Sequence, residues 1–453
     1  MKIATKANKT NIFCIIIFYE ANLLIFNLLC RMKSYDVVIA GAGAAGLIAA
    51  AQAAKLGVSV LLIEKKERCG RKIRITGKGR CNITNTKPWQ EFSKHIHPKA
   101  NFFKSAFYFF SNTSTIDFFN QIGVSTVIER GDRVFPESGR AQDVVEKLTE
   151  HIFKLGVDVI YNTEIQDVIV KDATVYSVIV GDIKGVEREI LCKSLIVATG
   201  GLSYPLTGST GDGYNIAEKL GHTIVTPLPS LTALMPKNYD QELKGLNLKN
   251  ITASLYVVND LVQSELGECE FTDNGFEGAL GFRLSRKAVK ALVNNNKVFV
   301  DLDLKPGVTH DQLISRINKE IKEKGSMKIY DVFAMIFPRQ LIAPFAAMNS
   351  FDLMKRVTEH DDYSIKRIVS ASKKWRLEII DYTGFERCVI TAGGVSTDEI
   401  ISKSLVSRII NNLYFAGEVI DLDADTGGYN LQIAFSTGAL AGYSAAQRIL
   451  KDR

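Results

Sequence analysis

The sequence predicts an α/β fold in which a doubly wound, mostly parallel sheet of the Rossmann type is interrupted by a β-rich insert domain with a helical portion. Two continuous apolar runs, YDVVIA (35–40) and VSVLLI (58–63), flank a glycine-rich turn and a helical stretch, as in a βαβ unit. Apolar runs at 194–201 and 412–418 predict two further buried strands of the same sheet. Between them, residues 226–389 contain stretches that alternate apolar and polar positions, which is typical of half-exposed strands.

Composition limits the function classes. The chain has 453 residues, 46% of them hydrophobic and 23% charged, with a formal net charge of +7. It suggests two or three domains and excludes a disordered chain and a many-span membrane protein. The charge excess is too small to indicate nucleic acid as the main partner. The seven cysteines form no CxxC pair and no metal-ligand array, so we predict a reducing, cytoplasmic location without disulfides or a metal site.

The N-terminal residues 1–31 need a separate interpretation. The segment 11–30 is apolar enough to resemble a membrane span, but Glu20 and two asparagines interrupt it, and only four residues separate it from the first predicted strand. We interpret Met32 as the true start and residues 1–31 as an upstream translation artefact, with a membrane anchor as the alternative. No stable membrane association is expected unless this extension is real.

The glycine-rich turn GAGAAG (41–46) follows the first strand and opens a helix. Gly41 permits the tight turn, Gly43 lets the backbone approach a pyrophosphate, and Gly46 lets the helix pack closely on the strand. The helix N-terminus offers free N–H groups to the phosphates. Glu64 ends the second strand, 23 residues after Gly41, where a carboxylate accepts both ribose hydroxyls and disfavours a 2′-phosphate. These features predict a site for the ADP half of FAD or NAD.

The C-terminal end favours FAD. The apolar run NLYFAGE (412–418) leads into an acidic loop and a long small-residue helix predicted at 431–450. Acids near a strand end can bind ribityl hydroxyls, and a helix N-terminus stabilises the negative charge of a reduced isoalloxazine ring. Residues 427–430 lie where that N-terminus would face the ring. A nicotinamide dehydrogenase usually needs no second loop of this kind.

The basic segment EKKERCGRKIRITGKGRCNITN (64–85) lies between these ends. A Walker phosphate loop is the obvious rival, but six residues rather than four separate Gly70 from Gly77, and Lys78 is followed by glycine. RNA binding by a basic turn lacks interleaved aromatic residues. We predict that this segment leaves the ribose-binding strand and runs along the anionic cofactor, with some of its cations against the pyrophosphate. Cys81 is interpreted as a buried small residue rather than a nucleophile.

Together these motifs resemble the BaiN/RdsA-type FAD-dependent oxidoreductases, which include the YhiN-like flavoproteins and relatives of aminoacetone oxidase. The resemblance covers residues 34–450. It rests on GAGAAG (41–46), GRKIRITGKGRCNITN (70–85), DRVFPESGRAQDVVEKL (132–148), ATGGLSYPLTGSTGDGYNIAEKLGH (198–222), PLPSLTALMP (227–236), TAGGVSTDEI (391–400) and LYFAGEVIDLDADTGGYNLQIAFSTGALAG (413–442). FTDNGFEGALGFRLS (271–285) is a looser match, because Asp273, Phe276 and Glu277 stand where a histidine and a Ser-Gly-Pro turn are expected.

The resemblance implies tightly bound FAD and a set of residues that hold it. Glu64, Arg71 and Lys72 would meet the adenosine ribose and phosphates, whereas residues 80–82 would lie towards the flavin. The predicted cofactor-binding set is Gly41, Gly43, Ala44, Ala45, Gly46, Glu64, Lys65, Arg71, Lys72, Gly79, Arg80, Cys81, Asn82, Ala198, Thr199, Gly200, Gly417, Glu418, Asp421, Gly427, Gly428, Tyr429 and Asn430.

The same interpretation divides the chain into four segments. Residues 1–31 are the extension, 32–225 and 390–453 form the two parts of the FAD-binding domain, and 226–389 form the insert, which we expect to shape the substrate pocket. A polar helix is predicted at 309–324. The two prolines of FPRQLIAPF (337–345) predict a break between subdomains.

The expected activity is hydride transfer between NAD(P)H and a small unsaturated organic substrate through bound FAD. NAD(P)H would bind transiently, since GSTGDG (208–213) has the wrong order for a second dinucleotide turn. Tyr204 and Tyr429 are candidate proton donors because their motifs bracket the ring, and none of the six histidines stands out. The alternatives are an oxidase that passes electrons from a small amine to O₂, a non-catalytic FAD-binding or redox-sensing protein, and an RNA-associated flavoprotein. We expect a small-molecule partner and no nucleic acid.

Overall fold

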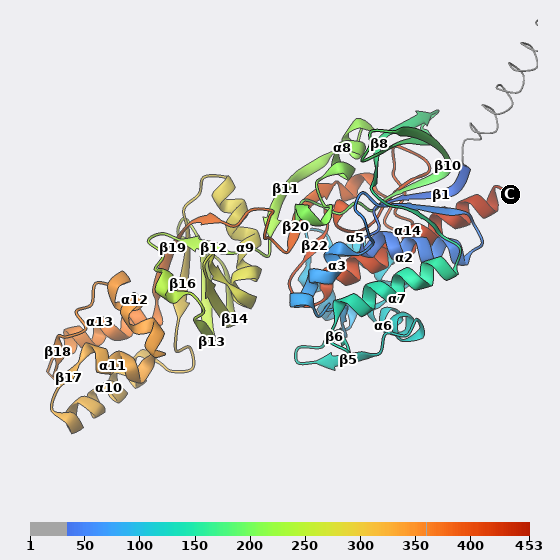
Figure 1. Cartoon of the computed structure of the whole chain (residues 1–453). Helices are drawn as coiled ribbons and strands as arrows, with labels where there is room; N and C mark the ends of the chain where they lie inside the picture. Colours follow the sequence, from blue (N-terminus) through green and yellow to red (C-terminus); the bar gives the residue numbers. More distant parts are fainter. Residues whose placement is uncertain (1–33, 359) are drawn as a thin grey trace, which may run out of the picture.

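The computed structural model describes residues 34–358 and 360–453, so the predicted extension at 1–31 lies outside the described residues. The described chain forms two bodies (Figure 1). The main body contains the first and last parts of the chain around one hydrophobic core. The insert, built from the residues between them, has a second core of its own and extends away from the main body. None of the described helices combines the length and apolar composition that a membrane span needs.

The main body is organised around a seven-stranded sheet in the order β7-β2-β1-β10-β9-β8, with β21 paired to β10. Five of these strands run parallel, and β9 and β8 are antiparallel additions at one side. All four apolar runs that predicted buried strands lie in this sheet, which confirms the doubly wound, mostly parallel fold. The strands are β1 (Ser34–Ala40), β2 (Val60–Ile63), β7 (Asp158–Ile160), β8 (Thr163–Lys171), β9 (Thr174–Asp182), β10 (Glu187–Val197) and β21 (Leu413–Phe415).

Two helices from opposite ends of the chain pack side by side against this sheet: α2 (Ala44–Lys55) and α14 (Tyr429–Lys451) (Figure 1). They approach so closely that a Cβ atom on Gly438 would lie 2.2 Å from the carbonyl oxygen of Ala45. A Cβ atom on Gly442 would lie 2.2 Å from the carbonyl oxygen of Ala49. These small residues therefore let the two backbones touch, as predicted for the C-terminal helix.

The remaining elements of the main body surround this pair and the sheet edges. The helices are α3 (Arg71–Ile75), α4 (Trp89–Phe92), α5 (Ala100–Phe109), α6 (Asn112–Gln121), α7 (Ala141–Lys154) and α8 (Asp212–Lys219). The short strands are β3 (Thr84–Asn85), β4 (Ile96–His97), β5 (Thr126–Glu129), β6 (Arg133–Pro136) and β22 (Asp423–Ala424).

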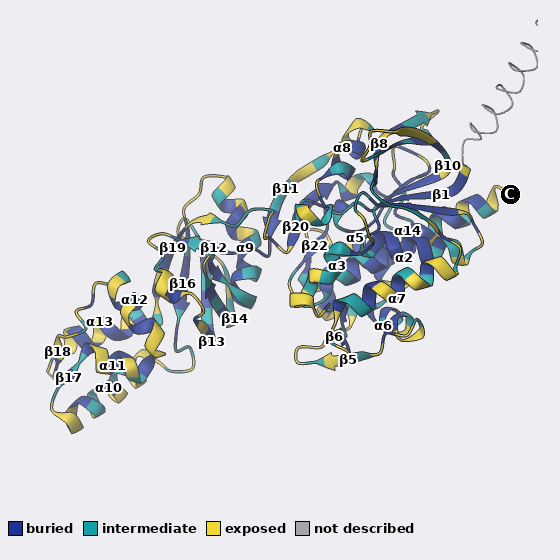
Figure 2. Ribbon diagram, viewed as in Figure 1, coloured by how far each residue is buried: buried dark blue, intermediate teal, exposed yellow. Residues whose placement is uncertain are grey.

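The insert begins with a closed barrel in the order β12-β15-β14-β13-β16-β19, against which α9 (Gly278–Val293) packs. A helical portion is inserted between β16 and β19 and lies at the far end, where Figure 2 shows more exposed surface than in the central sheet. The barrel strands are β12 (Leu234–Pro236), β13 (Asn247–Val257), β14 (Asp260–Thr272), β15 (Gly275–Glu277), β16 (Val298–Asp303) and β19 (Trp375–Tyr382). The helical portion comprises α10 (His310–Lys324), β17 (Met327–Lys328), α11 (Ile329–Ile336), α12 (Arg339–Met348), β18 (Arg356–Val357) and α13 (Asp362–Lys373).

The predicted break at 337–345 is wrong, because most of this segment is helix α12. Pro338 is the N-cap, where the N–H that proline lacks would have no partner within the helix. Pro344 lies inside the helix, and the apolar neighbours Leu341 and Phe345 are buried in the insert core. Tertiary packing therefore outweighs the local proline signal.

A strand ribbon and an ion pair are among the links between the described parts of the two bodies. Strands β11 (Ile224–Ser230) and β20 (Ile390–Val395) form an antiparallel ribbon. Beside it, Arg286 on α9 donates from Nε to both carboxylate oxygens of Asp423 at 3.0 and 3.2 Å. Asp423 is fully buried, so burial raises its pKa while the arginine opposes that shift. The ion pair fixes the insert at the edge of the main body.

We predict that Gly442→Ala lowers the free energy of unfolding by about 2 kcal/mol, because the new methyl group overlaps the Ala49 carbonyl and forces α2 and α14 apart. Thermal unfolding of the purified protein measures this. Gly307→Ala is the matched control, since a Cβ atom there meets nothing within 4 Å. Equal melting temperatures for the two variants would contradict the close-packing argument.

Candidate cofactor and active site

A cavity of about 1560 Å³ runs from the first βαβ turn, along the N-terminus of α14, to the wall of the insert. Ligand pockets are commonly about 300–1,000 Å³, so this cavity has room for a large cofactor and a second ligand. Most of the predicted cofactor residues line it. They are Gly41, Gly43, Ala44, Ala45, Glu64, Lys65, Arg71, Lys72, Arg80, Asn82, Ala198, Thr199, Gly200, Gly417, Glu418, Gly427, Gly428, Tyr429 and Asn430.

Glu64 lies at one end of the cavity, at the end of β2. Its two carboxylate oxygens accept the backbone N–H of Ala42 at 2.9 Å and that of Lys66 at 2.8 Å. Burial raises the pKa of Glu64, and these two hydrogen bonds oppose the shift. The backbone therefore holds the carboxylate in one orientation at the position expected for ribose recognition.

The neighbouring turn has the geometry that a pyrophosphate needs. Gly41 has a positive φ of 98°, and a Cβ atom there would lie 2.6 Å from the carbonyl oxygen of Ala198. Gly43 faces open space, since a Cβ atom there would meet nothing within 4 Å, and α2 begins at the next residue. The buried Oγ1 of Thr199 has no hydrogen-bond partner among the described residues. An FAD molecule fits these features, since its phosphates and adenosine would supply the missing contacts.

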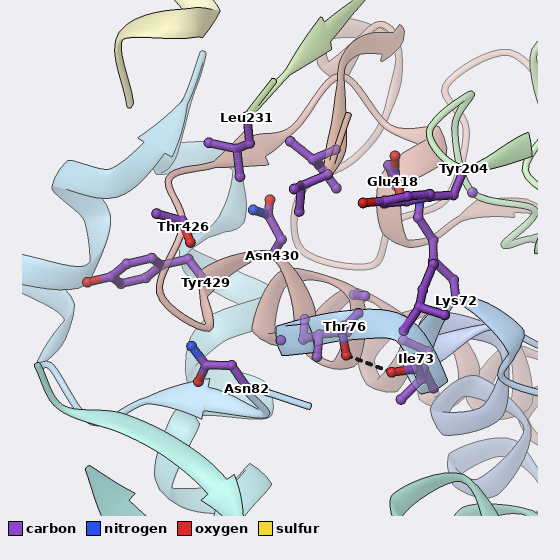
Figure 3. Close-up of a pocket in the computed structure, with 18 of the residues that line it drawn as sticks. Lys72, Ile73, Thr76, Asn82, Tyr204, Leu231, Glu418, Thr426, Tyr429 and Asn430 are labelled. Atoms are coloured by element: carbon purple, nitrogen blue, oxygen red, sulfur yellow. Dashed lines mark hydrogen bonds and ion pairs between the residues drawn. The ribbon is translucent and has the colours of Figure 1, made fainter. Parts of the chain in front are cut away.

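A polar network occupies the middle of the cavity (Figure 3). Lys72 Nζ lies 2.5 Å from both Glu418 Oε2 and Ser203 Oγ, and the backbone N–H of Thr391 donates to Glu418 Oε1 at 2.9 Å. Lys72 points towards Glu418 and Tyr204 (Figure 3). The resemblance implied that it meets the adenosine ribose and phosphates, and that role stays a prediction. Arg71 and Arg80 likewise pair with Glu67 and Glu129.

The loop before α14 forms the other end of the cavity. Gly428 is the N-cap of α14 with a φ of 97°, and a Cβ atom there would lie 2.4 Å from the carbonyl oxygen of Thr84. The Asn430 side chain holds the loop by accepting from Ala424 N at 2.8 Å and donating to Ala424 O at 2.7 Å. This arrangement presents the first N–H groups of a 23-residue helix to the cavity.

The two candidate proton donors differ in their surroundings. Tyr204 lines the cavity with a left-handed backbone (φ 53°) that is held by its N–H donating to Phe385 O at 2.9 Å. Its hydroxyl has no hydrogen-bond partner in the described part of the chain, and burial raises its pKa. Tyr429 is only 3% exposed and is enclosed by Phe92 and His95. Neither hydroxyl has a hydrogen-bond partner in the described part of the chain, but the Tyr204 side chain is the less enclosed of the two and so the better placed for a ligand.

Four predicted cofactor residues do not line the cavity. Gly46 faces the Gly41 carbonyl, which a Cβ atom would approach to 1.9 Å, so it serves helix packing. Gly79 turns the backbone with a φ of 85°. Cys81 is fully buried, and burial raises its pKa to about 12. Asp421 is buried beside Asp423, where burial and that second carboxylate raise its pKa.

The structure also brings residues to the cavity that the sequence did not indicate. Asp212 belongs to the GSTGDG segment, and its carboxylate lies 2.5 Å from Lys65 Nζ. Arg387 lines the cavity near Tyr204. His95 lines it beside Tyr429 and is paired with Asp425. A second glycine-rich segment soon after ATGG was a usable signal for Asp212, whereas no local pattern identified His95 or Arg387.

We predict that Glu64→Gln weakens FAD binding about 10- to 100-fold, because an amide can offer only one oxygen to the two backbone donors and ribose. The ratio of FAD to protein after extensive dilution measures the effect. Glu67→Gln is the control, since that nearby carboxylate is exposed and pairs with Arg71 at the surface. Full FAD retention by Glu64→Gln would contradict the ribose assignment.

Comparison with known proteins agrees with this geometry. The family described as HI0933-like protein Rossmann domain matches residues 35–444. The 3-dehydro-bile acid delta(4,6)-reductase of Clostridium scindens is 30% identical over 413 residues, covering 90% of this chain and 98% of that protein. The ribosomal RNA dihydrouridine synthase of Escherichia coli is 29% identical over 412 residues, covering 90% of this chain and 96% of its own length.

Among solved structures, a 3-ketosteroid delta1-dehydrogenase from Sterolibacterium denitrificans is 13% identical. The match covers 92% of this chain and 100% of that protein with a TM-score of 0.50, which supports the fold alone. The family match spans nearly the whole described chain, and the predicted motifs line one cavity. The chain therefore belongs to the HI0933-like Rossmann family and is an FAD-dependent oxidoreductase of the BaiN/RdsA type.

Proposed function

We propose that this chain adds two hydrogens across a carbon–carbon double bond conjugated to a carbonyl group in a small, polar organic substrate, using NAD(P)H as the electron source. The proposal rests on the names of two relatives, because each name refers to a substrate with a carbon–carbon double bond conjugated to a carbonyl group. A Δ4 bond beside a 3-oxo group and the C5=C6 bond of uracil are both conjugated to a carbonyl, and both relatives are matched over at least 96% of their length. A common cofactor site with a variable pocket would explain the difference in substrates.

When bound, FAD supplies the hydride chemistry, and this chain supplies binding, orientation and proton handling. Glu64 and the turn at 41–46 would hold the adenosine and pyrophosphate. The Lys72–Glu418 pair and the loop at 427–430 would hold the rest of the cofactor. The Tyr204 hydroxyl would donate a hydrogen bond to the substrate carbonyl oxygen. This hydrogen bond would lower the barrier to hydride addition at the β-carbon.

The cavity wall formed by the insert favours a polar substrate. It combines apolar surfaces such as Leu231 and Phe282 with many charged groups. These charged residues are Lys249, Glu268, Glu270, Glu277, Arg283 and Arg387. A hydrocarbon ring without polar substituents would remove water from these charged groups and offer them no polar partner, whereas a ring with polar substituents would satisfy some of them.

Uridine in RNA is the second candidate substrate, because the E. coli relative bears the name ribosomal RNA dihydrouridine synthase. The modest charge excess of +7 favours a small molecule instead. A cytoplasmic location remains part of the proposal.

Anaerobic mixing of the FAD-loaded protein with NADH or NADPH tests the electron source. We expect one of them to bleach the flavin absorbance, and 2-cyclohexen-1-one, used as a probe enone, to restore it. Bleaching by a small amine, with peroxide formed on admitting air, would instead support the oxidase. A gain of two hydrogens in ribosomal RNA, seen by mass spectrometry with no turnover of enones, would support the RNA substrate. Inertness to all donors would overturn the reductase proposal.

We predict that Tyr204→Phe slows flavin reoxidation by the probe enone about 100-fold, since the carbonyl oxygen loses the hydrogen-bond donor that polarises it. Flavin reduction by NAD(P)H should stay within about twofold of wild type, because that step involves no substrate carbonyl. Stopped-flow absorbance separates the two half-reactions. Tyr363→Phe is the control, since that tyrosine is exposed and does not line the cavity. Equal reoxidation rates in both variants would exclude Tyr204 from this role.

A further inference from the structure

The most informative unassigned cluster in the described chain is Asp425 between two imidazoles. His95 Nδ1 lies 2.9 Å from Asp425 Oδ2, and His97 Nε2 lies 3.2 Å from Oδ1. Burial would raise the pKa of Asp425, but the hydrogen bonds from His95 and His97 outweigh burial and lower it to about 2. The carboxylate is therefore a fixed negative charge at neutral pH.

Backbone hydrogen bonds also hold His95, His97 and Asp425 together. Strand β4, which ends at His97, pairs antiparallel with β22, which ends just before Asp425. The backbone N–H of Asp425 also donates to the carbonyl oxygen of His95 at 2.9 Å. Since an ionised carboxylate can only accept, Nδ1 is the protonated nitrogen of His95.

His95 has one ring nitrogen left for the cavity. It lines the same cavity as the cofactor residues, and its Nε2 has no hydrogen-bond partner among the described residues. Its ring stacks on Tyr429 with the centroids 4.4 Å apart and the planes 19° from parallel. Tyr429 is the first residue of α14, so His95 lies beside the helix N-terminus that faces the proposed flavin site.

His222 shows what a purely structural histidine looks like in this chain. It is 3% exposed, and both of its ring nitrogens have protein partners: Nδ1 is 3.3 Å from Ala217 O and Nε2 is 2.8 Å from Ser407 Oγ. The His95 side chain is 30% exposed, has a carboxylate on one nitrogen and faces the cavity with the other. An imidazole oriented in this way is the usual arrangement of a group that gains and loses protons.

We propose that His95, oriented by Asp425, takes up a proton when the bound FAD is reduced and is the proton store of this active site. A bound FAD that accepts hydride would gain two electrons and one proton, and therefore one negative charge. A proton taken from solvent onto His95 Nε2 balances that charge. When the hydride leaves for the substrate, the Nε2–H bond breaks and its proton completes the addition of two hydrogens.

Other charged and titratable groups lie near His95 and affect the charge of this site. His97 on β4 shares the carboxylate, and Tyr429 on α14 covers one face of the His95 ring. Burial raises the pKa of the Tyr429 hydroxyl most, the charges of Asp425, Asp132 and Glu91 raise it further, and Arg283 of the insert opposes them. Of these four charged residues only Asp425 is in hydrogen-bond contact with His95.

The midpoint potential of bound FAD, measured against pH, tests the proposal without any substrate. Each proton taken up with two electrons changes the potential by about 30 mV for each tenfold change in proton concentration. We expect the slope of His95→Gln to be shallower than that of wild type by about that amount within the range from about pH 6 to 8, because one proton is lost. His97→Gln is the matched control: it shares Asp425 and is similarly exposed, but it does not line the cavity.

A slope for His95→Gln equal to those of wild type and His97→Gln overturns the proposal. If His95→Gln does not retain FAD, His95→Asn provides the same measurement with a shorter neutral side chain. Since the potential needs neither NAD(P)H nor an enone, a wrong substrate under the proposed function would leave this test unaffected.

Discussion

The fold depends on the backbone contact between α2 and α14. Gly438 and Gly442 bring helix α14 against the carbonyl oxygens of Ala45 and Ala49, so α2 and α14 act as one packed unit. The glycine-rich turn at 41–46 begins α2, and the loop at 427–430 begins α14. Their two N-termini therefore open onto the same cavity, and a wider helix spacing would separate the two ends of one bound cofactor.

The insert completes the cavity without taking part in this packing. Its own core is formed around a barrel, and it meets the main body through the β11–β20 ribbon and the Arg286–Asp423 ion pair. The glycine-rich turn, Glu64 and the loop at 427–430 thus belong to the main body, while another part of the cavity wall belongs to the insert. Such an arrangement is compatible with relatives that are named for different substrates, a bile acid and ribosomal RNA.

Local sequence patterns predicted the cavity residues that belong to a known motif. They did not predict cavity residues whose side-chain partners lie far away in the chain. The turn at 41–46, Glu64 and the start of α14 were found because each combines a strand end, glycines and a charge at fixed spacing. The pairing of His95 with Asp425 spans 330 positions and exists only because β4 pairs with β22. Lys72 and Glu418 are 346 positions apart and meet only after the sheet closes. Helix α12 formed across two prolines because its apolar face is buried in the insert core.

The order of the chain also matters while it is being synthesised. Strand β21 and helix α14 leave the ribosome after the insert, and until then the edge of β10 and the Ala-rich face of α2 have no covering partner. The insert, with a separate core, can fold during that interval. While residues 198–412 are synthesised, the nascent main body therefore exposes an unpaired strand edge, the kind of surface on which nascent chains aggregate.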